Sequence, residues 1–148
     1  MKQIKKSNGY SQNVAGVKRA TMNGFKNTDL PMVNIWSGPD QAAGAGAGFS
    51  MRELTIMVEI YDQTRDRPFD EVAQELALDV TMALHRATNA PKATDNPEPT
   101  LNKLITSLQR ETVTPLIGEG QNPWCGAQIV FTAKYNTRND GFTPAKPI

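Results

Sequence analysis

The sequence predicts an α+β fold, in which a mostly antiparallel or mixed β-sheet of four to five strands packs against one long helix. Two segments, "RELTIMVEIYDQ" (52–63) and "WCGAQIVFTAKYNT" (124–137), alternate apolar and polar residues, a period typical of strands. Residues 68–88 instead repeat apolar side chains every three to four positions, as a helix does when it covers one face of a sheet. These two periods together predict the fold class.

Length and composition fit a single domain, 1–148. The chain has 39% apolar and 21% charged residues, and no apolar run reaches the roughly 18 residues that a membrane span requires. Its basic first residues lack the apolar stretch of a secretory signal, and the single cysteine, Cys125, forms no intramolecular disulfide. We therefore expect a chain made in the cytosol, with no membrane partner.

The first strand is predicted at "LPMVNIW" (30–36), and the glycine-rich stretch "GPDQAAGAGAGFS" (38–50) follows it. A dinucleotide-binding loop has the spacing G-x-G-x-x-G and opens a helix, and a P-loop ends in Gly-Lys-Ser/Thr. Here Gly44, Gly46 and Gly48 alternate and lead into a strand. We expect the mobile tip of a β-hairpin, ordered only against a neighbouring subunit or another partner.

The helix is predicted over 68–88, because Pro68 suits a first turn and acidic residues follow it. The proline-rich segment 89–100 reads as a loop. The next segment fits either a helical stripe or a strand, and we expect a strand that begins near Leu104 and ends at the turn "IGEGQNP". The predicted order is β, β, α, β, β, with an optional short strand before Leu30 and a C-terminal arm over about 138–148.

Charge is distributed unevenly along the chain. Residues 1–28 carry basic side chains and no acid, whereas residues 62–80 are mainly acidic. We interpret residues from 1 to about 27 as a basic N-terminal arm. Such polarity serves a nucleic-acid patch, a head-to-tail contact between copies, or simply two solvated surfaces.

The residues that could carry chemistry are few. His85 is the only histidine, so His85 and Cys125 cannot assemble the usual zinc site within one copy, and a Cys125–His85 dyad is left open by spacing alone. Glu71, Glu75 and Asp79 share one helical face, which we expect to be exposed and either solvated or in contact with another subunit. No catalytic residue, metal or cofactor is expected.

The order of the segments along the chain indicates a family, which composition alone does not. "DLP" before the first strand, "LITSL" (104–108) and the closing "VFTAKYNT" (130–137) resemble the tail terminator proteins of long-tailed bacteriophages, of the lambda-type minor tail protein U kind. The resemblance covers roughly residues 28–137. The chain departs from it in lacking an amphipathic helix before the first strand and in having a longer tail beyond Thr137.

The resemblance implies a structural virion protein without catalytic activity. Members form a ring, usually of six copies, that caps the finished tail tube, stops its polymerisation and offers a docking surface to the head-tail connector. DNA would pass through the ring without specific binding. The location implied is the head-proximal end of the tail, reached from the host cytoplasm during assembly.

In a ring-forming protein, loops and arms are the natural contact elements. We expect the basic arm to contact the acidic helix of a neighbour, so that reversing Glu71 and Glu75 to lysine weakens assembly at low salt. The candidate contact residues for neighbouring subunits or the tail tube are Lys18, Arg19, Gly38, Asp40, Gly44, Gly46, Gly48, Glu71, Glu75 and Asp79.

Other functions remain open at this point. The pattern also fits another tail-completion or neck protein, or a tail-tube subunit. A small nucleic-acid-binding protein that uses the basic first 28 residues is an alternative from another class, although aromatic residues are only sparsely interleaved there. Removal of the arm would abolish a steep salt dependence of DNA affinity in such a protein.

Overall fold

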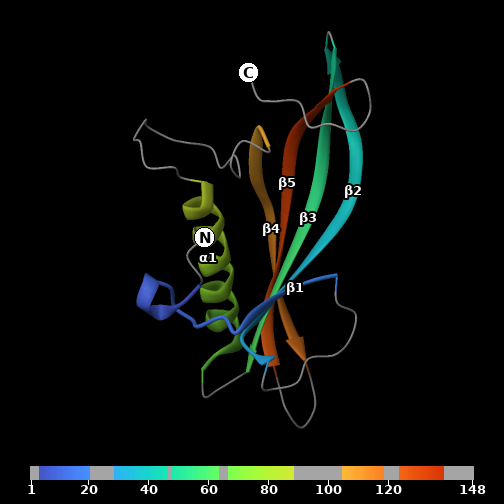
Figure 1. Cartoon of the computed structure of the whole chain (residues 1–148). Helices are drawn as coiled ribbons and strands as arrows, with labels where there is room; N and C mark the ends of the chain where they lie inside the picture. Colours follow the sequence, from blue (N-terminus) through green and yellow to red (C-terminus); the bar gives the residue numbers. More distant parts are fainter. Residues whose placement is uncertain are drawn as a thin grey trace.

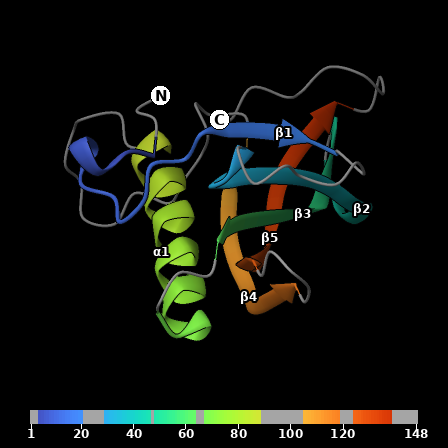
Figure 2. The same ribbon diagram turned by 90° about the horizontal axis from the view of Figure 1, so that it is seen from below.

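The computed structural model describes residues 4–20, 29–46, 48–63, 67–88, 105–118 and 124–138, and it has two layers. One layer is a five-stranded sheet in the order β1-β2-β3-β5-β4, and helix α1 lies on one face of it (Figures 1 and 2). All neighbouring strands are antiparallel except β1 and β2, which are parallel. The α+β class with a mixed sheet is confirmed. The elements are η1 (Lys6–Asn8), β1 (Gly16–Arg19), β2 (Met32–Gly46), β3 (Phe49–Gln63), α1 (Phe69–Thr88), β4 (Ser107–Gly118) and β5 (Trp124–Arg138).

Most predicted elements lie where periodicity placed them. The two alternating segments are β3 and β5, which pair along their whole length from Phe49↔Arg138 to Gln63↔Trp124. The segment that fitted either a helix or a strand forms β4, which begins at Ser107, close to the expected start. The optional strand before Leu30 exists as β1. The expected C-terminal arm and the loop over 89–100 fall outside the described residues, apart from Arg138, which ends β5.

The prediction of a mobile tip at the glycine-rich stretch, residues 38–50, is corrected by the structure, in which most of the stretch is a β-strand. Gly38, Asp40, Gly44 and Gly46 all belong to β2, whose pairing with β3 continues to Gly46↔Phe49. The stretch therefore needs no partner to form a strand, because the long apolar alternation of β3 provides a template for its backbone. Two register shifts, between Ser37 and Asp40 and between Ala42 and Gly44, accommodate residues of low strand propensity.

Two glycines have a specific place in this hairpin. Gly48 adopts a φ of 82°, the left-handed conformation that a tight connection needs. A Cβ at Gly46 would lie 2.5 Å from the ring of Phe49, so the aromatic ring packs directly on the glycine backbone. The hairpin is thus a narrow, closely packed end of the sheet.

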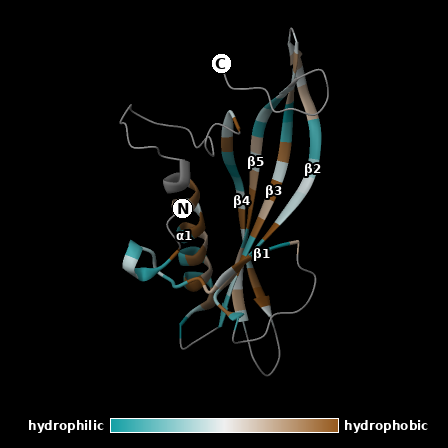
Figure 3. Ribbon diagram, viewed as in Figure 1, coloured by the Kyte–Doolittle hydropathy of each residue, from teal (hydrophilic) through white to brown (hydrophobic). Residues whose placement is uncertain are grey.

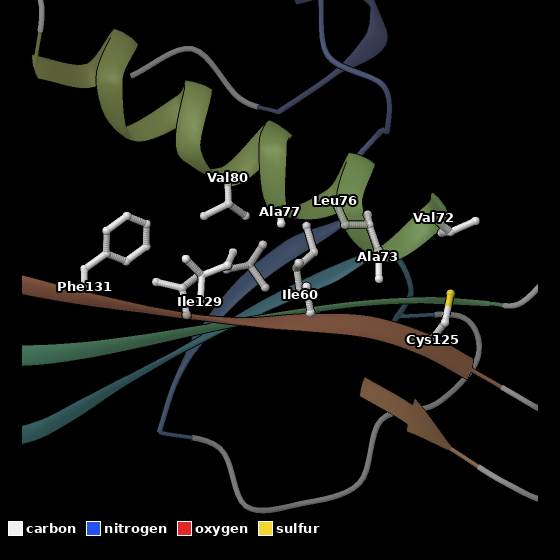
Figure 4. Packing of buried hydrophobic residues seen from close by; sticks show 12 residues of the cluster. Ile60, Val72, Ala73, Leu76, Ala77, Val80, Cys125, Ile129 and Phe131 are labelled. Carbon is white, nitrogen blue, oxygen red and sulfur yellow. The ribbon is translucent and has the colours of Figure 1, made fainter. Parts of the chain in front are cut away.

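The core forms between α1 and the helix-side face of the sheet (Figure 4). Leu76 from α1, Ile60 from β3 and Ile129 from β5 belong to one apolar cluster, and all three are fully buried. The register explains why these side chains share one face, since Ile60 pairs with Ala127 and Val58 with Ile129. Burial of each such side chain contributes about 1.5–3 kcal/mol relative to exposure.

The helix covers only part of the sheet. β2, β3 and β5 continue past α1 and past the start of β4 as a three-stranded extension, which we call the projecting ribbon and define as residues 40–46, 49–52 and 135–138 (Figure 1). β1 pairs only with Met32–Ile35 of β2, below this ribbon. Most of residues 37–45 are exposed.

Substitution of Leu76 by alanine should destabilise the fold strongly. The side chain is fully buried among core residues, so we expect a loss of about 2–5 kcal/mol in the free energy of unfolding, measured by chemical denaturation. Leu78→Ala, two positions away on the same helix but 52% exposed, is the matched control and should change it by less than about 1 kcal/mol. Equal losses for both variants would contradict this packing.

Candidate interaction surface

Asp79 is buried rather than exposed, which corrects the predicted acidic helix face. Only 1% of Asp79 is accessible, and its two carboxylate oxygens accept hydrogen bonds from the backbone amides of Ser11 and Gln12, at 2.9 Å each. The partner of this helix acid is therefore the N-terminal segment of the same chain. Helical spacing alone could not show this, because it does not reveal what covers the face.

The basic arm, as far as it is described, is part of the fold and not a free arm. Tyr10 is buried, and Ile4 and Val14 pack against the core cluster. The amide of Ala15 then donates to the carbonyl of Pro31 at 2.7 Å, and the chain enters β1. Sequence patterns missed this docking because its apolar residues are isolated and follow neither a helical nor a strand period.

The two predicted basic contact residues lie on β1. Lys18 forms an ion pair with Asp29 at 3.6 Å within the chain. Arg19 lies opposite Ile35 and is exposed. Both residues therefore sit on the outermost strand of the sheet next to β2, rather than on a mobile segment.

The remaining acids of the helix face have an internal counter-ion. Arg67 donates to both carboxylate oxygens of Glu75, at 2.7 and 2.9 Å, and lies 3.6 Å from Glu71. The hydrogen bond from Arg67 lowers the pKa of Glu75 below its ordinary value. Because these side chains are largely solvated, such pairs add little to stability. They do reduce the negative charge that this face presents to a partner.

A groove of about 540 Å³ opens between α1 and the edge strand β4. Its apolar lining comes from Ala77, Leu78 and Val113, and charged or polar side chains form its walls. Leu78 and Val113 are 52% and 37% exposed, so the groove is an uncovered apolar surface. The polar and charged lining residues are Arg67, Glu71, Gln74, Glu75 and Arg110.

Sequence reasoning did not predict this groove. Leu78 falls between the stripe positions of α1, and Val113 lies between two threonines in an edge strand. An apolar residue outside the buried stripe of α1 was the only available indication. The groove forms only because α1 and β4, which are far apart in the sequence, pack against each other.

Asp40 joins three strands on the projecting ribbon. Its carboxylate accepts hydrogen bonds from Tyr135 Oη at 2.6 Å and from Arg52 Nε at 3.0 Å, and Arg52 also donates to its backbone carbonyl. The hydrogen bond from Tyr135, together with the charge of Arg52, lowers the pKa of Asp40. This Asp40–Arg52–Tyr135 brace connects β2, β3 and β5 where no helix supports the sheet.

Glu59 organises the face of the sheet opposite α1. Its carboxylate accepts hydrogen bonds from Trp36 Nε1 at 2.6 Å, Gln128 Nε2 at 3.2 Å and Asn34 Nδ2 at 3.3 Å. Burial, with the neighbouring Glu59, raises the pKa of Tyr61 far above its ordinary value. The donors come from β2 and β5, so this half-buried carboxylate holds the central strands together.

The residues considered for catalysis lie as follows. Cys125 is fully buried in β5, and burial raises the pKa of its thiol. His85 belongs to α1, but its side chain lies outside the described part of the structure. Among the described side chains, no cluster of three or more His, Cys, Asp or Glu residues could hold a metal ion. Within the same residues, no helix has the length and apolar character needed to cross a bilayer.

Comparison of the sequence with models of protein families and with curated proteins gave no match. The surfaces described above therefore carry the functional interpretation: the projecting ribbon, the β1 and β4 edges, and the groove beside α1.

Replacement of Asp79 by asparagine should release the N-terminal segment. Asparagine offers one acceptor oxygen and turns an amide group toward the second backbone N–H, so we expect a loss of about 1–3 kcal/mol in unfolding free energy. Hydrogen exchange at the amides of Ser11 and Gln12 should accelerate. Glu75→Gln is the control, with less than about 1 kcal/mol and no change at these amides. Unchanged protection of the Ser11 and Gln12 amides from exchange in Asp79→Asn would show that Asp79 does not hold the N-terminal segment.

The titration of Asp40 should depend on Tyr135. A lowered pKa in the folded state means that the brace stabilises the fold above the ordinary aspartate pKa of about 3.9 and weakens as the pH falls through the lowered value. By carboxyl-carbon NMR, Asp40 should titrate below that ordinary value, and Tyr135→Phe should raise the midpoint. Tyr61→Phe, on the opposite face, should leave it unchanged. A midpoint insensitive to Tyr135→Phe would count against the brace.

Proposed function

We propose that this protein is a phage tail terminator that assembles into a closed ring, most simply a hexamer, on the end of a tail tube. The proposal begins from the resemblance of residues 28–137 to that family. Of the segments that carry it, "DLP" immediately precedes β2, "LITSL" leads into β4 and "VFTAKYNT" forms the upper part of β5. Two of the quoted segments thus lead into strands of the sheet, and the third belongs to β5.

The observation that carries the proposal is the projecting ribbon itself. It is a three-stranded extension with no helix layer, and apolar and hydrophilic residues are interspersed along it (Figure 3). Met51 near its end is 41% exposed, and Phe49 packs on Gly46. The Asp40–Arg52–Tyr135 brace links the three strands of the ribbon. A sheet extension of this kind is suited to contact a neighbouring subunit or the tube.

The proposed mechanism is geometric. A head-to-tail contact between identical subunits forms a ring when successive rotations close, and an open filament when they do not. A closed ring would cover the growing end of a tube and present a different surface to the connector. Because the ribbon projects from one end of the two-layer body, it gives each subunit two distinct ends for these two contacts.

The oligomeric state tests the proposal directly. We expect the purified protein to give a single closed species by native mass spectrometry, with a ring visible by electron microscopy, and the ring to be a multiple of the 16.2 kDa chain. A variant in which a two-residue turn replaces residues 43–51 keeps the closing pair Ala42↔Arg52, shortens the ribbon and leaves the core intact. It should remain folded by circular dichroism but lose the ability to stop tube growth.

Two results would overturn the proposal. One is a monomer at all concentrations that also fails to bind preformed tail tubes. The other is DNA affinity that falls steeply with salt and disappears when the exposed Lys5 and Lys6 are replaced by glutamine, because a nucleic-acid-binding protein behaves in this way.

A further inference from the structure

We propose that the groove between α1 and β4 receives strand β1 of a second copy of this chain, so that β1 of one subunit pairs with β4 of the next. The inference rests on the proposed function only in assuming that copies of this chain assemble into a ring. It specifies which surfaces meet, in which register, and can be tested separately. Four observations support it: strand direction, apolar exposure, charge, and the position of a proline.

Strand direction comes first. β1 and β4 are the two outer strands of the described sheet. β1 runs parallel to β2, and the direction then reverses at each step through β3, β5 and β4, so β4 runs opposite to β1. Two copies placed side by side with the same orientation therefore bring β1 against β4 as an antiparallel pair. Repetition of this contact gives a head-to-tail assembly.

The exposed apolar side chains fit this pairing. Val17 is 63% exposed and shares the helix-side face, since it lies opposite the core residue Val33. Val113 lies on the same face, opposite Ile129, and lines the groove together with Leu78. With Val17 placed opposite Val113, its side chain enters the groove of the next copy. This contact would cover the most exposed apolar residue of β1 and the apolar lining of the groove.

Charge agrees with the same register. An antiparallel pair with Val17 opposite Val113 brings Arg19 beside Glu111, the residue at the register shift of β4 between Arg110 and Thr112, so opposite charges lie next to each other across the strands. Lys18 then lies opposite Thr112, and no like charges are opposed. Arg67 and Arg110 already offset the acids of the groove walls, which leaves the Arg19–Glu111 pair as the specific charge contact.

Pro115 favours this register. Proline has no N–H to donate to a neighbouring strand, so it interrupts pairing along an edge. In the proposed register Pro115 lies opposite Ala15, outside β1, and the paired residues of β4 are 111–114. The four residues of β1 fit within the proline-free part of β4, residues 107–114, and in this register they end just before Pro115.

Cysteine cross-linking tests the contact. One preparation carries Val17→Cys and another carries Val113→Cys, and the two are mixed at high concentration under mild oxidation. Directly opposed residues of an antiparallel pair lie about 4.5–5.5 Å apart at Cα, within the range of a disulfide. We expect disulfide-linked heterodimers from the mixture and none from either preparation alone. Wild-type protein is the control, because its only cysteine, Cys125, is fully buried.

The other outcomes are decisive as well. Homodimers of Val113→Cys would overturn the inference, since they indicate two β4 strands paired about a two-fold axis. An oligomer by native mass without Val17–Val113 cross-links would overturn it while the proposed ring stands. A cross-linked open filament would support the inference and contradict the ring. A monomer at every concentration would overturn the inference, leaving the ring to its own test on tail tubes.

A charge exchange tests the register. Arg19→Glu and Glu111→Arg should each weaken association by about fivefold or more, and the double variant should recover most of it. Lys5→Glu makes the same charge change in an exposed residue outside β1 and should have little effect. Circular dichroism and unfolding free energy should stay unchanged in all of these variants. Failure of the double variant to recover association would show that Arg19 and Glu111 do not face each other.

Discussion

The apolar cluster that joins Leu76 of α1 to Ile60 and Ile129 of the central strands is the constraint on which the rest of the structure depends. All three side chains are fully buried in the apolar cluster between the two layers. One helix can cover only a limited length of sheet, while β3 and β5 pair over all their residues. The sheet therefore has two parts. The part covered by α1 is stabilised by apolar burial, and the projecting ribbon is held together by backbone hydrogen bonds between strands and by the Asp40–Arg52–Tyr135 brace.

The same helix positions the N-terminal segment. Asp79 accepts two backbone amides from Ser11 and Gln12, and this tie directs the following residues along β2 as the parallel strand β1. A carboxylate buried this deeply requires hydrogen bonds to compensate its lost hydration, and the N-terminal segment supplies them. As a consequence, the basic residues Lys18 and Arg19 are held at a defined sheet edge. Their position gives the proposed contact with β4 a register rather than a general attraction between charges.

Local periodicity predicted most of the fold. The alternation in β3 and β5 and the spacing of Val72, Leu76 and Val80 each depend on side chains within one element, and the structure confirms them. The prediction of a mobile tip at the glycine-rich stretch was wrong. It relied on the low strand propensity of these residues, but backbone pairing with β3 overrides that preference. The α1–β4 groove was not predicted because Leu78 and Val113 become neighbours only when distant segments pack together.

The sequence by itself determined the α+β class, the identity of the main elements and the residues that face the core. These follow from hydrophobic periods of two and of three to four residues, which are properties of single segments. Only the tertiary structure decided that Asp79 is a buried tie rather than an exposed contact, that Gly44 and Gly46 extend a strand, and that β1 and β4 are the outer strands of the sheet as far as it is described. The physical reason is that burial, strand pairing and edge position are relations between segments, and no local pattern encodes them.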